Sequence, residues 1–119
     1  MSETKTYTGS CHCGTVSYET DADLSQVISC NCSICRKRGL LLAFVPEGAF
    51  RLKGGEEGLT DYTFNKGIIH HLFCSKCGVG SFSRGIAPDG SKTIAINVRC
   101  LDGVDLDGLN IRKLDGAKL

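Results

Sequence analysis

The sequence predicts a mainly β fold in a single domain, and three features support this prediction. Its 119 residues suffice for one compact domain with one hydrophobic core. Short alternating or apolar runs are separated by glycine and polar clusters, a pattern typical of strands joined by turns. Fifteen glycines and eight cysteines stand out from an otherwise ordinary globular composition. We therefore expect residues 1–119 to form one domain, in which apolar burial is not the only stabilising contribution.

Five segments are expected to form strands that supply most of the core. Residues 15–19, 60–64 and 79–83 alternate between apolar and polar side chains, as strands with one buried face do. Residues 40–45 and 94–98 are denser apolar runs, which suit buried strands.

Glycines mark the connections between these strands. They recur at positions where turns favour a residue without a Cβ atom: Gly54, Gly55, Gly85, Gly90, Gly103 and Gly108. Residues 33–38 are followed by Gly39, which predicts one short helical turn ended by its glycine. No long helix is expected, and the tail 102–119 either closes the sheet or frays.

Charge and the first residues indicate the class of protein. The formal net charge of +1 argues against a main role in holding nucleic acid or anionic membrane. Seven deprotonated cysteines with two Zn²⁺ ions would change that charge to −2. The start of the chain lacks the apolar core of a secretory signal, and no segment approaches the length of a membrane helix. We predict a cytoplasmic protein, whose closely spaced cysteines bind metal rather than form disulfides.

The cysteines form three clusters. The first is Cys11-His12-Cys13-Gly14, the second is Cys30-Asn31-Cys32-Ser33-Ile34-Cys35, and the third is Cys74-Ser75-Lys76-Cys77-Gly78. Thiolates two or three positions apart on a tight turn can converge on tetrahedral zinc with little strain.

The first and third clusters share one design, because each ends with a cysteine and a glycine and then enters an alternating strand. Pairing them gives a closed set of four thiolates, which are Cys11, Cys13, Cys74 and Cys77. We predict a structural zinc there, whose binding free energy contributes directly to folding.

The middle cluster has three cysteines and no obvious fourth ligand beside it. A zinc ion held by Cys30, Cys32 and Cys35 would keep a position for water or substrate, as catalytic zinc sites do. Three thiolates give the site a net charge of −1, which makes it a poor activator of water. Binding a thiol or polarising a small carbonyl group suits it better.

These motifs resemble the glutathione-dependent formaldehyde-activating family, which includes centromere protein V-like domains. The similar segments, in the same order as in the family, are Gly9 to Gly14, Cys30 to Lys37, Phe73 to Gly78, and Asn97 to Asp102. They span residues 9–102, which is most of the chain.

The resemblance implies a β-tent fold of packed antiparallel sheets with two zinc ions per chain. Cys11, Cys13, Cys74 and Cys77 would hold the structural ion, and Cys30, Cys32 and Cys35 the catalytic ion. The family's named reaction joins glutathione and formaldehyde to give S-hydroxymethylglutathione, formally a carbon-sulfur lyase in reverse. The expected partners are therefore a thiol such as glutathione and a small aldehyde.

The basic run after the middle cluster is a candidate substrate site. One or two of Arg36, Lys37 and Arg38 are expected to offset the zinc-thiolate charge and to attract the carboxylates of a thiol substrate, with Arg36 and Lys37 as the candidates. The alternative is an ordinary solvated turn.

Other interpretations stay open at this point. Four thiolates also suit iron, and Cys100, His12 or a partner chain could fill the fourth position of the second site. The chain would then be a non-catalytic zinc module for protein interaction. A weaker alternative is nucleic-acid binding through residues 36–38.

Cys100 is interpreted as a small core residue, and His70 and His71 should face opposite sides of a strand.

Overall fold

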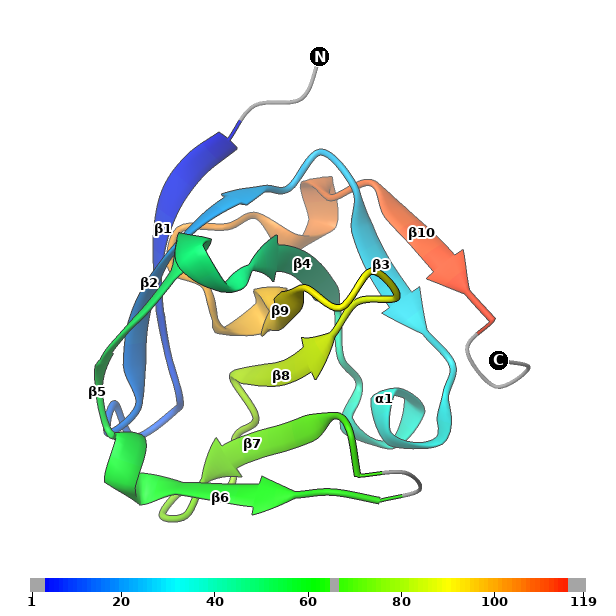
Figure 1. Cartoon of the computed structure of the whole chain (residues 1–119). Helices are drawn as coiled ribbons and strands as arrows, with labels where there is room; N and C mark the ends of the chain where they lie inside the picture. Colours follow the sequence, from blue (N-terminus) through cyan, green and yellow to red (C-terminus); the bar gives the residue numbers. More distant parts are fainter. Residues whose placement is uncertain (1–3, 65–66, 116–119) are drawn as a thin grey trace.

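The structure, a computed structural model, describes residues 4–64 and 67–115 as two packed β-sheets. Figure 1 shows the smaller sheet, with order β1-β2-β5, on the left. Its strands are Thr4–Ser10, Ser17–Asp23 and Phe50–Gly54. The larger sheet has the order β10-β3-β4-β9-β8-β7-β6. Its strands are, in that order, Ile111–Leu114, Val27–Cys30, Leu42–Pro46, Lys92–Asn97, Phe82–Ile86, His70–Cys74 and Leu59–Tyr62.

The hydrophobic core lies between the two sheets. Tyr18 and Phe50 from the smaller sheet meet Phe82 from the larger one, with ring centroids 4.6 to 6.0 Å apart. Ile94 and Ile96 of β9 are fully buried against them. Gly9 is required beside this core, because a Cβ atom there would lie 2.6 Å from the Tyr18 ring. The mainly β fold of packed antiparallel sheets is thus confirmed.

The five predicted strands all exist, with ends displaced by one to four residues. They correspond to β2, β4, β6, β8 and β9. The cysteine turns displace two of them, since β2 begins at Ser17 and β8 at Phe82, after the chain has left each turn. In the tail, β10 closes the larger sheet by pairing in parallel with β3, while residues 116–119 lie outside the described part of the chain. This is the one parallel pair among the strands of residues 4–64 and 67–115.

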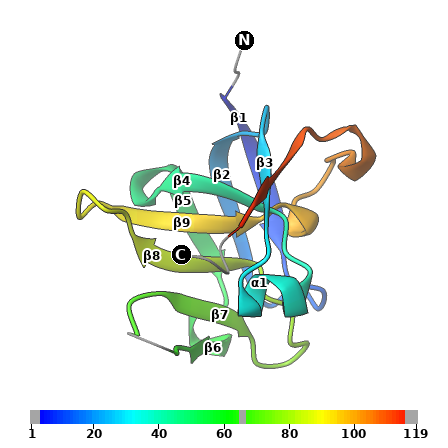
Figure 2. The ribbon, with the colours of Figure 1, turned by 90° about the vertical axis from the view of Figure 1, so that its right-hand side faces the viewer.

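The predicted helical turn is α1, Ser33–Arg38, and it ends as expected at Gly39 with φ of 69°. Figure 2 shows α1 at the end of β3, beside the edge formed by β6 and β7. Four additional 3-10 turns of three residues each occur in the described chain: Glu47–Ala49, Glu56–Gly58, Val98–Cys100 and Leu106–Gly108. None of these helices is long and apolar enough to span a membrane, within the described residues.

The face of the larger sheet that points away from the core carries a row of aligned side chains. Cross-strand pairing aligns Phe44, Ala95, Ser83, His71 and Tyr62 in one row across five strands. Residues paired in this way point to the same side of a sheet. Ser83 and His71 are buried in the row, while Phe44 and Tyr62 are about half exposed.

Candidate metal centres and adjoining pockets

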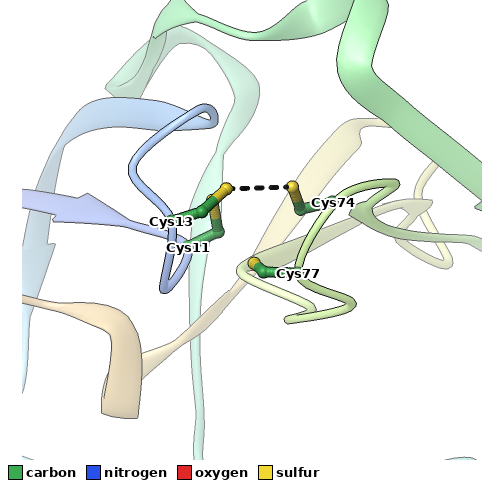
Figure 3. A group of neighbouring side chains, drawn as sticks. All are labelled: Cys11, Cys13, Cys74 and Cys77. Carbon is green, nitrogen blue, oxygen red and sulfur yellow. Dashed lines mark hydrogen bonds between the residues drawn. The ribbon is translucent and has the colours of Figure 1, made fainter.

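The first and third cysteine clusters come together in space. Figure 3 shows Cys11 and Cys13 on one turn facing Cys74 and Cys77 on another. The Sγ atom of Cys13 lies 3.6 Å from those of both Cys11 and Cys74, and all four sulfurs lie within 4.8 Å of one another. Zn–S bonds of about 2.3 Å in a tetrahedron place sulfurs about 3.8 Å apart, so this donor set fits zinc.

The two turns have matching hydrogen bonds. In the first turn, the Cys11 N–H donates to the Val16 carbonyl, and the Gly14 N–H donates to the Cys11 carbonyl. In the second, Cys74 donates to Val79, and Gly78 donates to Cys74 in the same way.

The glycines of both turns adopt positive φ, 81° at Gly14 and 80° at Gly78. The shared design predicted from the sequence follows from this backbone, since such a φ favours a residue without a Cβ atom.

Backbone and hydroxyl groups favour the thiolate form at two of the four cysteines. The Thr15 hydroxyl, 3.1 Å from Cys13 Sγ, is the main reason that the pKa of Cys13 falls to about 6. A backbone hydrogen bond from Val79 lowers the pKa of Cys77. Burial instead raises the pKa of the Cys11 thiol. Zinc ligands must be deprotonated, so the two favoured thiolates assist metal binding.

The middle cluster also converges. Cys30 ends β3, Cys32 is the N-cap of α1, and Cys35 lies in its first turn, so that the three sulfurs lie within 4.8 Å of one another. Among residues 4–64 and 67–115, no fourth His, Cys, Asp or Glu joins this group. A three-sulfur set of this kind fits zinc with one further position for another ligand.

The Cys35 and Cys32 thiols differ in how readily they lose a proton. Burial raises the pKa of the Cys35 thiol, which is 8% exposed. Burial alone would also raise the pKa of Cys32, but hydrogen bonds from the Cys35 backbone and neighbouring groups lower it. Cys32 is therefore the readier of the two to act as a thiolate.

A pocket of about 440 Å³ lies beside this group, between α1 and the β6–β7 edge, and is named here the α1 pocket. Lys37 and Arg38 line one side, and the Arg38 guanidinium lies 5.5 Å from the centre of the Phe73 ring. Its other lining residues are Ser33, Ile34, Tyr62, Phe64 and Phe73. Arg36 is exposed and does not line this pocket, whereas Lys37, expected from the sequence, does.

The three histidines lie outside both cysteine groups. His70 is exposed, with Nδ1 2.6 Å from Asp61 Oδ2, whereas His71 is buried, as alternation on a strand predicted. Phe64 stacks on the His71 ring, and Nδ1 of His71 has no hydrogen-bond partner among the residues that the structure describes. His12 is exposed between Cys11 and Cys13.

Cys100 is half-buried, rather than a fully buried core residue, and belongs to neither group. Burial raises the pKa of its thiol.

The fourth sequence motif supports the fold around the first site. The Asn97 side chain donates to the Gly80 carbonyl and accepts from the Arg99 N–H. Asp102 accepts a hydrogen bond from the Thr8 hydroxyl, close to the strand that leads into Cys11. These contacts hold the loop after Cys77 and the strand before Cys11 against the same segment.

Comparison with known proteins agrees with the cysteine pattern. The family described as glutathione-dependent formaldehyde-activating enzyme matches residues 6–110. The chain belongs to this family. The match includes both cysteine groups and the four motifs from which the resemblance was inferred.

A crystal structure of a Rhodobacter sphaeroides protein has the same fold. It superposes with a TM-score of 0.79 at 30% sequence identity, over 90% of this chain and 99% of that one. The two-sheet architecture is therefore shared over nearly the whole of both chains.

Proposed function

We propose that this chain is a zinc-dependent enzyme of the carbon-sulfur lyase type, which joins a thiol to a small aldehyde and also catalyses the reverse reaction. The observation that carries the proposal is the three-sulfur group of Cys30, Cys32 and Cys35 beside the α1 pocket. An open coordination position next to a concave pocket is the arrangement expected of a catalytic zinc site. Membership of the family supports a thiol such as glutathione and formaldehyde as the substrate types.

In the proposed reaction, the thiol adds across the carbonyl double bond. The sulfur lone pair forms the new C–S bond, the π electrons of the C=O bond move to oxygen, and the proton lost by sulfur ends on that oxygen. The product is a hemithioacetal, and no oxidant or reductant is required. A bound zinc ion supplies Lewis acidity, which favours the thiolate form of a thiol at neutral pH.

The residues of the chain have distinct tasks in this proposal. Cys30, Cys32 and Cys35 hold the ion, while Cys11, Cys13, Cys74 and Cys77 hold the structural one. Lys37, with Arg38 beside it, attracts the carboxylates of the thiol. The aromatic wall of the α1 pocket covers the rest of the bound thiol and excludes water.

The test is thiol-dependent consumption of formaldehyde, measured above the uncatalysed rate, in wild type and Cys32→Ser. We expect the variant to lose most of the catalysed rate while keeping a folded structure, because Cys32 lies outside the core between the sheets. Equal catalysed rates would refute the enzymatic proposal. They would favour the alternative, a non-catalytic zinc module that presents a surface to another protein.

A further inference from the structure

A second pocket, named here the apolar pocket, lies on the outer face of the larger sheet. It has a volume of about 370 Å³, within the range of small-molecule sites. Strands β4, β8 and β9 supply Phe44, Gly85, Ile86, Thr93 and Ala95, and the connecting segments supply Ile69, Ala87 and Pro88. None of these lining residues carries a charge, and Thr93 is the one with a polar side chain.

The apolar pocket shares one wall residue, Ala95, with the apolar cluster around Cys35. Cys35 forms a small buried cluster with Leu40 and Leu42, and Ala95 packs against that cluster. Ala95 is also a wall of the apolar pocket. Leu42 and Phe44 point to the same side of β4, so one pair of strand residues, about 7 Å, separates the cluster from the pocket.

The same cysteine cluster also borders the α1 pocket. Ile34 packs against the cluster and lines the α1 pocket, just as Ala95 does for the apolar pocket. The cluster around Cys35 therefore borders two pockets of different chemistry, one with Lys37 and Arg38 and one whose lining residues carry no charge. Such an arrangement suits two substrates that meet at one centre.

We infer that the apolar pocket holds an alkyl or aryl substituent of the carbonyl substrate, so that this chain prefers apolar aldehydes to formaldehyde. The inference rests on the proposed function. The carboxylates of a thiol such as glutathione are excluded from the pocket, because burying a carboxylate without a partner costs several kcal/mol. Formaldehyde has no substituent and leaves the pocket unused, whereas an aldehyde such as hexanal places its chain there and gains from apolar burial.

Gly85 gives a way to fill the apolar pocket with little strain. A Cβ atom there meets its nearest neighbour, Ile69 Cγ1, at 3.7 Å, which is ordinary van der Waals contact. Gly48 is the matched control, since a Cβ atom there meets nothing within 4 Å and the residue lies outside the pocket. The informative pair is therefore Gly85→Leu and Gly48→Leu.

The first measurement compares kcat/KM for hexanal and formaldehyde with a common thiol. After each kcat/KM is divided by the uncatalysed rate constant of that aldehyde, which is larger for the more electrophilic formaldehyde, wild type should favour hexanal at least about tenfold through burial of its methylenes. Gly85→Leu should lose most of that preference with the formaldehyde rate unchanged, and Gly48→Leu should keep it. No preference in wild type, or equal loss for both aldehydes in Gly85→Leu, would overturn the inference.

A second measurement does not depend on turnover. Hexanamide, an unreactive analogue, should shift the NMR signals of the Ala95 and Thr93 methyl groups in wild type and in Gly48→Leu but not in Gly85→Leu. Ile86→Ser, at a residue that is 57% exposed, should weaken the same binding without unfolding the chain. Shifts absent from wild type, or self-association of the chain that Ile86→Ser abolishes, would assign this face a different role and overturn the inference.

Different experimental results would refute the proposed function and the preference for apolar aldehydes. Equal rates in wild type and Cys32→Ser with every aldehyde would remove the proposed function. Rates that depend on Cys32 but not on the length of the aldehyde would remove this inference alone.

Discussion

The Sγ atoms of Cys13 and Cys74 lie 3.6 Å apart, although 61 positions separate the two residues in the sequence. The contact joins the turn between β1 and β2 of the smaller sheet to the turn that follows β7 of the larger one. A zinc ion held at this point would link both sheets, and its binding free energy would become part of the folding free energy.

The first prediction concerns this closed site. Cys74→Ser removes one ligand, so the variant should retain one zinc ion fewer per chain. Its free energy of unfolding should fall by more than about 3 kcal/mol. Metal analysis and chemical denaturation measure the two effects. Cys100→Ser is the control, because Cys100 belongs to neither cysteine group; equal zinc content in Cys74→Ser and wild type would contradict the assignment.

The second prediction concerns the aromatic core. The ring centroid of Phe50 lies 4.6 Å from that of Phe82 and 5.1 Å from that of Tyr18, and Phe50 is 9% exposed. Phe50→Ala should lower the free energy of unfolding by about 3 to 5 kcal/mol through lost burial and the cavity left behind. Phe44→Ala removes a phenylalanine that is 51% exposed and should cost about 0.5 kcal/mol or less. Similar losses in both variants would argue against a core between the two sheets.

The third prediction concerns the basic wall of the α1 pocket. Lys37→Ala should raise KM for glutathione about twofold to fivefold, which corresponds to the interaction free energy of one exposed ion pair. The same variant should leave KM for uncharged 2-mercaptoethanol unchanged. Arg36→Ala tests the other residue expected from the sequence, and an unchanged KM would remove Arg36 from the substrate site. If Lys37→Ala raised KM for both thiols alike, its charge would not be what binds the substrate.

The fourth prediction concerns His71. Burial is the main cause that lowers the pKa of His71. The positive charge of Arg38 and the neighbouring His70 lower this pKa further, whereas the Asp61 carboxylate raises it. The unfolded chain has an ordinary histidine pKa of about 6.5. As the pH falls below that value, the unfolded state binds a proton that the folded state resists, so stability decreases by up to about 1.4 kcal/mol per pH unit.

The measurement for His71 is the free energy of unfolding between pH 7.5 and 5.5 at saturating zinc, in wild type and His71→Gln. Protonation of the cysteine ligands affects both proteins, so the difference between the two curves isolates His71. The wild type should lose more stability with acidification than the variant. Parallel curves would show that His71 does not resist protonation in the folded state.

Local sequence patterns predicted much of this structure. The cysteine-glycine turns were identifiable because ligand spacing and the positive φ at Gly14 and Gly78 are local properties. Alternation located three strands and the opposite orientations of His70 and His71, and dense apolar runs located two more strands. Gly39 after a basic stretch located the end of α1.

Features that depend on distant segments could not be predicted in this way. The parallel pairing of β10 with β3 joins residues 111–114 to residues 27–30, and no pattern in residues 102–119 indicates that partner. The α1 pocket joins Lys37 and Arg38 to aromatic residues of the β6–β7 edge. The sequence singled out the basic run of residues 36–38, but only the three-dimensional arrangement showed that Lys37 and Arg38 line the pocket and that Arg36 is exposed outside it.

The most direct test of the two proposed zinc sites is the number and coordination of metal ions in the purified chain, from elemental analysis and zinc X-ray absorption. Our expectation is two zinc ions per chain that share the seven clustered cysteines as sulfur ligands, with an oxygen ligand completing the site of Cys30, Cys32 and Cys35. A single zinc ion per chain, iron in its place, or four sulfur ligands on both ions would contradict it.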